Sequence, residues 1–175
     1  RLCSHASSQA VSTLAAGFNY VTVIAKDFTG NTTTFADAFY VKKDTAIPQV
    51  VVGPGLAGGD AAWRNADGSA YDVDFFNEGG NLDKFQVMAG TSPAAALPFL
   101  MDWTDKALSI GATYYQTDWT LPAGMWNSLF SGPATNYISV RAYNLSGSVS
   151  TYLDAFFVLK DTQTPSIANN MIGAD

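Results

Sequence analysis

The chain has 175 residues, of which 47% are hydrophobic and 13% aromatic but only 14% charged, against about 25% charged in an ordinary soluble domain. The net charge of −6 argues against nucleic acid as a partner, because binding to phosphates requires a basic surface. No apolar run reaches the roughly 18 residues needed to cross a bilayer, so we expect no membrane span. The few charges suggest that some apolar surface is covered by other chains or modules.

The sequence is typical of short β-strands separated by turns. Nearly all its acidic residues are Asp, which is frequent in turns, and Glu78 is the only glutamate. A glycine-rich loop is expected to follow residues 53–55 and to run through residues 65–68, and a single helical turn is expected over residues 125–129. No segment has sustained helical periodicity. The expected strands, in chain order, are residues 49–52, 70–76, 85–89, 99–103 (a short edge strand), 113–121, 136–142 and 151–160.

An internal repeat organises the chain. Residues 19–48 align without a gap to residues 136–165, at an offset of 117 (136 minus 19), and about half of the aligned positions are identical. Such similarity indicates duplication. The shared residues include Asn19 with Asn136, Tyr20 with Tyr137, Gly30 with Gly147, Asp37-Ala38-Phe39 with Asp154-Ala155-Phe156, and Pro48 with Pro165.

The repeat divides the chain into about one and a half units. Residues 1–47 match only the last strands of a unit, and residues 48–163 form a complete one. Residues 164–175 match the beginning of a further unit. Seven or so short strands in about 115 residues are typical of a β-sandwich, so we expect an all-β fold.

Residues 14–31 resemble bacterial immunoglobulin-like (Ig-like) repeat domains, with Gly-x-Asn before an alternating strand and Asp-x-x-Gly-Asn at its turn. The Asp-Thr-x-x-Pro sequence of residues 44–48 resembles the junction between tandem modules of large extracellular or cell-surface proteins. The second copy departs from the pattern at Asn144 and Ser148. The resemblance implies an Ig-like sandwich, extracellular or cell-surface display and a role in adhesion, spacing or assembly, without catalytic residues.

A tyrosine near the start of the penultimate strand of such a sandwich can bond back across the corner between strands. Tyr20 and Tyr137 are the candidates for this bond.

Catalytic or metal-binding chemistry has little support in the sequence. The only histidine, His5, lies near the only cysteine, Cys3, but two ligands do not make a metal site. Asp72 and Asp74 share one strand face and could act as paired carboxylates, although a solvated face explains them better. We therefore expect no enzyme, no cofactor and no resident metal.

Calcium binding is possible but unsupported. Asp60 and Asp67 could supply oxygen ligands from one loop, and Asp44 or Asp161 could do so at the module junctions. No dense acidic loop accompanies them, so turn residues in contact with solvent are the better interpretation.

The four tryptophans all belong to the complete unit. Trp119 alternates with apolar neighbours and is expected in the core, and Trp126 is expected to cap one end of the sandwich. Trp63, in the expected glycine-rich loop, is the best candidate for an exposed aromatic ring that stacks on a sugar.

The incomplete unit cannot fold well alone, because two or three strands leave an apolar face and open edges. The sequence therefore suggests that chains join head to tail into a fibre or sheath, with the tail of one chain adding a strand to the next. The residues expected to take part are Thr164, Pro165, Ser166, Ile167 and Ala168 of the tail, and Tyr20, Val21, Val23, Phe39 and Val41 of the incomplete unit.

Two other functions stay open. The chain could be a stalk or adhesin module of a long surface protein, whose partners are adjacent Ig-like modules. It could also be a carbohydrate- or surface-binding module that contacts cell-surface glycans.

Overall fold

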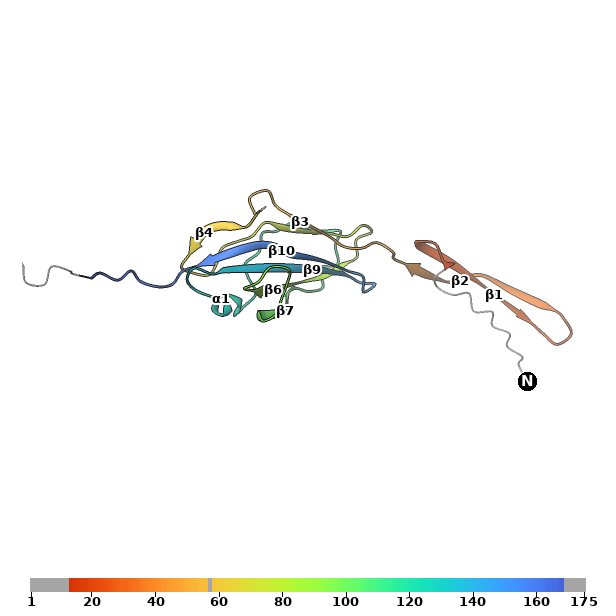
Figure 1. The fold of residues 1–175 in the computed structure, drawn as a ribbon. Helices are drawn as coiled ribbons and strands as arrows, with labels where there is room; N and C mark the ends of the chain where they lie inside the picture. Colours follow the sequence, from red (N-terminus) through yellow and green to blue (C-terminus); the bar gives the residue numbers. More distant parts are fainter. Residues whose placement is uncertain (1–12, 57, 169–175) are drawn as a thin grey trace, which may run out of the picture. The chain divides into compact units, whose positions relative to one another are not determined.

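The computed structural model describes residues 13–56 and 58–168. As Figure 1 shows, the regular secondary structure of these residues is almost entirely β-strand, which confirms the expected all-β class. The chain divides into two compact units, residues 1–45 and 46–175. The one α-helix in the described ranges, α1 (Met125–Ser128), is the single turn expected there.

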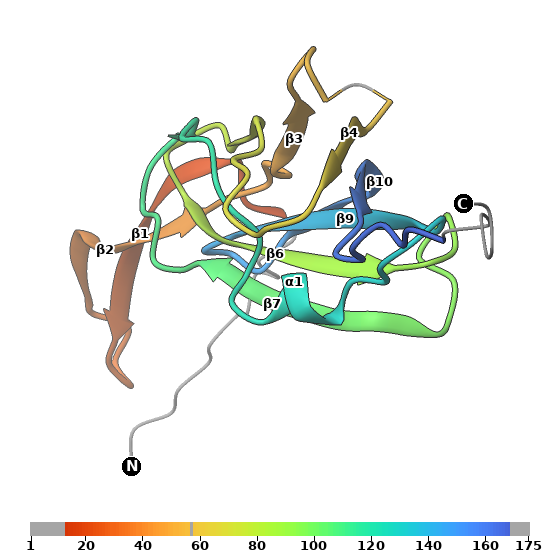
Figure 2. The same cartoon turned by 90° about the vertical axis from the view of Figure 1, so that its left-hand side faces the viewer.

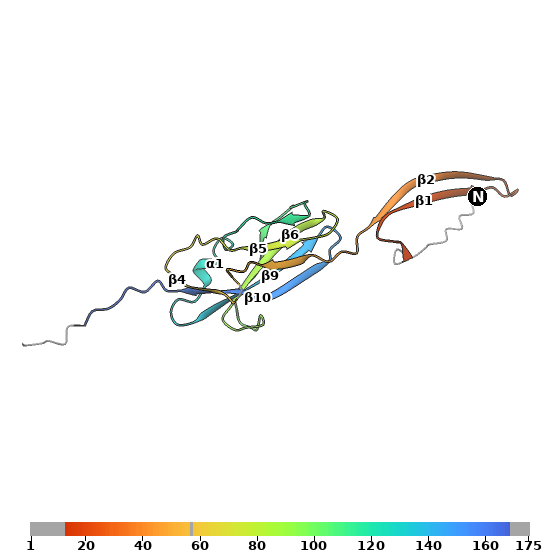
Figure 3. The same cartoon turned by 90° about the horizontal axis from the view of Figure 1, so that it is seen from above.

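The first unit contains one long antiparallel hairpin of β1 (Gly17–Lys26) and β2 (Thr32–Lys43), which is seen along its length in Figure 3. Its turn is held by Asp27, whose Oδ1 accepts hydrogen bonds from the backbone N–H groups of Thr29 (3.0 Å) and Asn31 (2.8 Å). The Asn31 side chain also donates to this carboxylate and is the main reason that the pKa of Asp27 is lowered. The local sequence therefore accounts for the turn.

The second unit contains two sheets. Figure 2 shows β9, β6 and β7 side by side in the larger sheet, whose full order is β4-β10-β9-β6-β7; the smaller sheet has the order β3-β5-β8. The edge position expected for residues 99–103 is confirmed, since β7 pairs only with β6. The strands are β3 (Gln49–Val52), β4 (Asp60–Arg64), β5 (Val73–Phe76), β6 (Leu82–Gly90), β7 (Phe99–Ala107), β8 (Tyr114–Tyr115), β9 (Thr135–Asn144) and β10 (Val149–Lys160).

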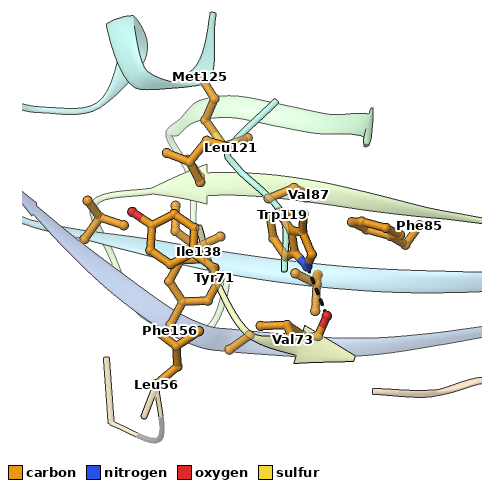
Figure 4. Packing of buried hydrophobic residues seen from close by; sticks show 14 of the residues in the cluster. Leu56, Tyr71, Val73, Phe85, Val87, Trp119, Leu121, Met125, Ile138 and Phe156 are labelled. Carbon is orange, nitrogen blue, oxygen red and sulfur yellow. Dashed lines mark hydrogen bonds between the residues drawn. The ribbon is translucent and has the colours of Figure 1, made fainter. Parts of the chain in front are cut away.

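The core lies between these two sheets, and aromatic rings fill much of it (Figure 4). Phe75 of β5 stacks on Phe85 of β6 with 4.1 Å between ring centroids, and Tyr71 stacks on Phe156 of β10 at 4.5 Å. Trp119 is buried as expected, and its indole N–H donates to the Val73 carbonyl at 3.0 Å. A buried indole N–H needs such a partner, so this bond sets the orientation of the ring.

The structure corrects two local expectations. The expected glycine-rich loop contains β4, which pairs in parallel with the end of β10, so Trp63 lies on a strand and not in a loop. Gly59, directly before β4, has φ of +103°, and a Cβ there would lie 1.9 Å from the Phe157 ring. The strand expected over residues 113–121 is shorter, because only β8 and an isolated bridge between Trp119 and Tyr71 pair there.

The buried hydroxyl of Tyr71 is expected to make the second unit less stable as the pH rises into the alkaline range. Burial is the main cause that raises its pKa from 10.0 to about 12, and the negative charge of Asp60 adds to this. Below about pH 10 the ring is neutral in both the folded and the unfolded chain; between about pH 10 and 12 only the unfolded chain loses the proton. We therefore expect the free energy of unfolding to fall across this window, by about 2–3 kcal/mol at its upper end.

Urea denaturation followed by circular dichroism, at about pH 9 and about pH 12, measures this loss. In Tyr71→Phe the part of the loss due to Tyr71 should disappear. An identical pH dependence in the two proteins would show that Tyr71 ionises as easily in the folded chain as in the unfolded one.

Candidate assembly site

The two segments of the internal repeat form hairpins with the same strand register. Tyr20 lies opposite Tyr40 in the first hairpin, and Tyr137 lies opposite Phe157 in the second, at the offset of the sequence alignment. The register continues past an irregularity in each hairpin, where Val23 faces Phe35 and Val140 faces Tyr152.

The irregularity itself is the same in both hairpins. Asp37 and Asp154, at equivalent positions, have left-handed φ angles of 50° and 51°, which residues with a side chain rarely adopt. The Asp37 N–H donates to the Thr22 hydroxyl at 3.4 Å, and the Asp154 N–H donates to the Ser139 hydroxyl at 2.9 Å. Each hairpin thus has the same bulge, with a hydrogen bond from an aspartate N–H to a side-chain hydroxyl.

An asparagine ties the start of each hairpin to the chain before it. The Asn136 amide donates to the carbonyls of Phe130 (3.0 Å) and Val158 (3.1 Å), and its Oδ1 accepts the Phe130 N–H at 2.8 Å. Asn19 makes a similar set of bonds: its amide donates to the carbonyls of Val41 (3.4 Å), the equivalent of Val158, and of Ala15 (2.8 Å), and its Oδ1 accepts the Ala15 N–H at 3.1 Å. Ala15 lies four residues before Asn19, whereas Phe130 lies six residues before Asn136.

The asparagines therefore make the corner contact expected of the neighbouring tyrosines. Tyr20 instead is 66% exposed and packs against Tyr40 on the outward face of the hairpin. The amide fits this corner because it donates two hydrogen bonds and accepts one at the same time, whereas a phenol has a single O–H to donate.

A lysine is the last residue of the second strand in both hairpins, Lys43 in β2 and Lys160 in β10. The Lys160 Nζ donates to the carbonyls of Trp126 (2.8 Å) and Leu129 (3.1 Å), and the side chain is buried. The Lys43 Nζ donates in the same way to the Leu14 carbonyl at 2.8 Å. A lysine that ends on backbone carbonyls is suited to a buried end of a sandwich, because its charge stays bonded.

The two hairpins differ in how far their equivalent apolar side chains are buried. Val140 and Phe156 of β9 and β10 are 0% and 2% exposed, whereas the equivalent Val23 and Phe39 of β1 and β2 are 46% and 54% exposed. We call the surface formed by Val21, Val23, Ala25, Phe39 and Val41 the inward face of the first hairpin. Val23, Ala25 and Phe39 of this apolar face are exposed, and Val21 and Val41 are half-buried.

Four of the five residues predicted for assembly in this unit lie on the inward face. They are Val21, Val23, Phe39 and Val41, since Val21 pairs with Phe39 and strand side chains alternate. Tyr20 points the opposite way. The sequence alone did not separate these two groups, because it does not give the register.

The five predicted tail residues, Thr164, Pro165, Ser166, Ile167 and Ala168, lie in no strand and are all exposed. The Ile167 side chain is 98% exposed. The rest of the tail, residues 169–175, lies outside the described residues.

Of the aromatic candidates, Trp63 is 55% exposed on β4 and lies opposite Leu159 of β10. Trp103 is partly buried beneath the guanidinium of Arg141, 4.3 Å from its ring centroid. Trp126 packs against the core at one end, as expected, and Lys160 lies over its ring.

The acidic candidates show no shared ligand geometry. Asp60 forms an ion pair with Arg64 at 3.0 Å, and the Asp67 carboxylate accepts the N–H of Gly68. Asp74 has its pKa raised, first by burial and then by the nearby charge of Asp72. In residues 13–56 and 58–168, no three His, Cys, Asp or Glu side chains are grouped to hold a metal ion; Cys3 and His5 lie outside these ranges.

No family model and no curated protein matches this chain. Within the described part of the chain, no helix has the length and apolar character needed to cross a bilayer. The two equivalent hairpins and their different burial are the features of the chain that bear on its function.

We expect Asn136→Ala to destabilise the second unit by about 2–4 kcal/mol, because the buried Val158 carbonyl and the part-buried N–H and carbonyl of Phe130 lose this partner. Asn19→Ala is the matched control and should leave this transition unchanged. Both are measured by urea denaturation followed by Trp fluorescence, which reports only on the second unit because all four tryptophans lie there. Equal stability of Asn136→Ala and the wild type would show that the corner bonds contribute nothing.

Proposed function

We propose that this chain belongs to a non-enzymatic, extracellular structural protein built from Ig-like β-sandwich modules that are arranged head to tail. Residues 48–163 are one complete module, and residues 1–47 are the closing part of the module before it. The observation that carries the proposal is the equivalence of the two hairpins in register, bulge, asparagine corner and lysine contact, while only one has its inward face buried.

The first hairpin needs a cover. An isolated two-stranded ribbon is marginally stable at best, and this one exposes Val23, Phe39 and other apolar side chains of its inward face. In the second unit, the equivalent face is covered by the β3-β5-β8 sheet, and its edges are paired with β4 and β6. A neighbouring module or chain that supplies these parts would complete the first hairpin.

Such a contact joins two different surfaces, one from each neighbour. Because it does not close on itself, repetition gives a linear array, which suits a fibre, a sheath or a stalk. We include display outside the cell and a role in adhesion in this proposal, because a linear array suits both.

Strand complementation by the tail of a neighbouring chain has one supporting observation. Ile167 of the tail is equivalent to Val50 of β3, which packs against the core of the second unit. The exposed Ile167 has the apolar chemistry to take that place on another chain. The tail corresponds to β3 alone, however, and has no counterparts of β4 to β8 to offer.

A carbohydrate- or surface-binding role is supported only by the exposed Trp63 ring on the edge strand β4. Its neighbour Leu159 is partly buried and apolar. The pair offers a small stacking surface for an apolar sugar face.

Association of the purified full chain tests the head-to-tail proposal. In analytical ultracentrifugation we expect the wild type to associate as its concentration rises, and Phe39→Asp to weaken association at least tenfold, because a charge would enter an apolar contact. Tyr40→Asp is the matched control, since Tyr40 is the next residue of the same strand and lies on the outward face. It should associate within about threefold of the wild type.

A deletion of residues 164–175 in the same assay decides the role of the tail, since a tail donor requires that the truncated chain no longer associates. If the wild type stays monomeric throughout, or if Phe39→Asp associates as well as Tyr40→Asp, self-assembly through the inward face is wrong.

A further inference from the structure

We infer that the inward face of the first hairpin is a binding surface for the front half of a β-sandwich that packs like residues 48–134 of this chain. This inference rests on the proposed function and adds the chemistry of the partner. Its basis is a comparison between the two hairpins, residue by residue, which separates positions that are buried in the second unit from positions that are not.

Sequence identity between the hairpins follows burial. Ten residues of the segment 136–160 are buried, and seven of them are identical at the equivalent positions of the segment 19–43. Among the other fifteen positions, four are identical. The seven shared buried residues are Asn136, Val140, Ala142, Ala155, Phe156, Val158 and Lys160, equivalent to Asn19, Val23, Ala25, Ala38, Phe39, Val41 and Lys43.

The three remaining buried positions differ only slightly. Ile138 is replaced by Val, Ser139 by Thr and Asn144 by Asp, so two differ by a single methyl group and one exchanges an amide for a carboxylate. The Val replacement removes about one buried methylene, a change that a core tolerates at small cost. The inward faces of the two hairpins are thus close to interchangeable in volume and polarity.

The outward faces have diverged in charge and size. Arg141 and Leu159 of the second hairpin are equivalent to Ile24 and Lys42 of the first. Two of the four identities outside the core, Gly147 and Asp154, occur at left-handed backbone positions, where the turn and the bulge restrict the residue. A hairpin with both faces in water has no packing reason to keep one face so closely, so the inward face of the first hairpin retains the chemistry of a buried surface.

The second unit shows what the partner must supply. Tyr71 and Trp119 pack on Phe156, with ring centroids 4.5 and 6.0 Å away, so the partner places aromatic rings over Phe39. Val87 of β6 lies opposite Val140 in an antiparallel pair. By the shared register, the partner contributes an antiparallel strand with an apolar residue opposite Val23.

A hairpin exchange within the full chain tests the inference. Residues 19–43 are grafted in place of residues 136–160, so that the first hairpin's sequence meets the front half formed by residues 48–134. We expect the second unit to keep one cooperative thermal transition, with a midpoint lowered by less than about 15 °C, as for a few small core changes. Trp119 fluorescence and near-UV circular dichroism should stay native.

A shifted graft, with residues 20–44 in the same place, is the matched control. It has the same length and nearly the same composition, but it puts Tyr40 at the buried position of Phe156 and the large Phe39 at the buried position of the small Ala155. We expect it to lose the cooperative transition. A shifted graft as stable as the correct one would overturn the inference, because the inward face would then not be specific.

If the correct graft does not fold, a third variant decides whether its inward face is responsible. It carries only Ile138→Val, Ser139→Thr and Asn144→Asp. A folded third variant supports the inference, since the outward substitutions then cause the failure, and an unfolded one overturns it.

The graft reports packing inside one chain and does not depend on association. If the graft folds but the wild-type chain is monomeric, the inferred chemistry of the partner stands and only self-assembly is rejected. An unfolded third variant with intact association would do the opposite.

Discussion

Phe156 of β10 packs against the rings of Tyr71 and Trp119 in the core of the second unit. This contact holds the β9–β10 hairpin against the rest of the core. Burial of this ring and of its neighbours Val140 and Val158 provides the apolar area that offsets the entropy of ordering two long strands. The first hairpin has the same residues at the equivalent positions of its own strands, but there Val23 and Phe39 are exposed. This difference supports the proposal that its inward face packs against a partner.

The polar residues of the two hairpins support this view. Asn136 and Lys160 are buried and bonded to backbone groups, and Asn19 and Lys43 make bonds of the same kind in a more exposed setting. Such residues add little to an exposed ribbon, where water would serve the same backbone groups. They become valuable when the surroundings are apolar, because an unpaired group is then expensive.

Much of this fold follows from the sequence, because hairpins with alternating apolar residues and Gly-containing turns are local features. The inward set Tyr71, Val73 and Phe75 was predictable from alternation, and the two-hairpin repeat from alignment. The strand β4 was not predictable, since its pairing with β10 is parallel, short and distant in sequence. The candidate site was predicted in part: the apolar residues came from the pattern, but their separation from Tyr20 and the asparagine corner required the register.

Amide hydrogen exchange, measured residue by residue on the monomeric full chain, tests the central claim most directly. The account predicts that amides of β9 and β10 exchange only with unfolding of the second unit, with protection of roughly 10³ or more. Amides of β1 and β2 should exchange far faster in the same sample and become protected when the chain is part of its assembly. Equal protection of the two hairpins in the isolated monomer would contradict the account, because the first hairpin would then need no partner.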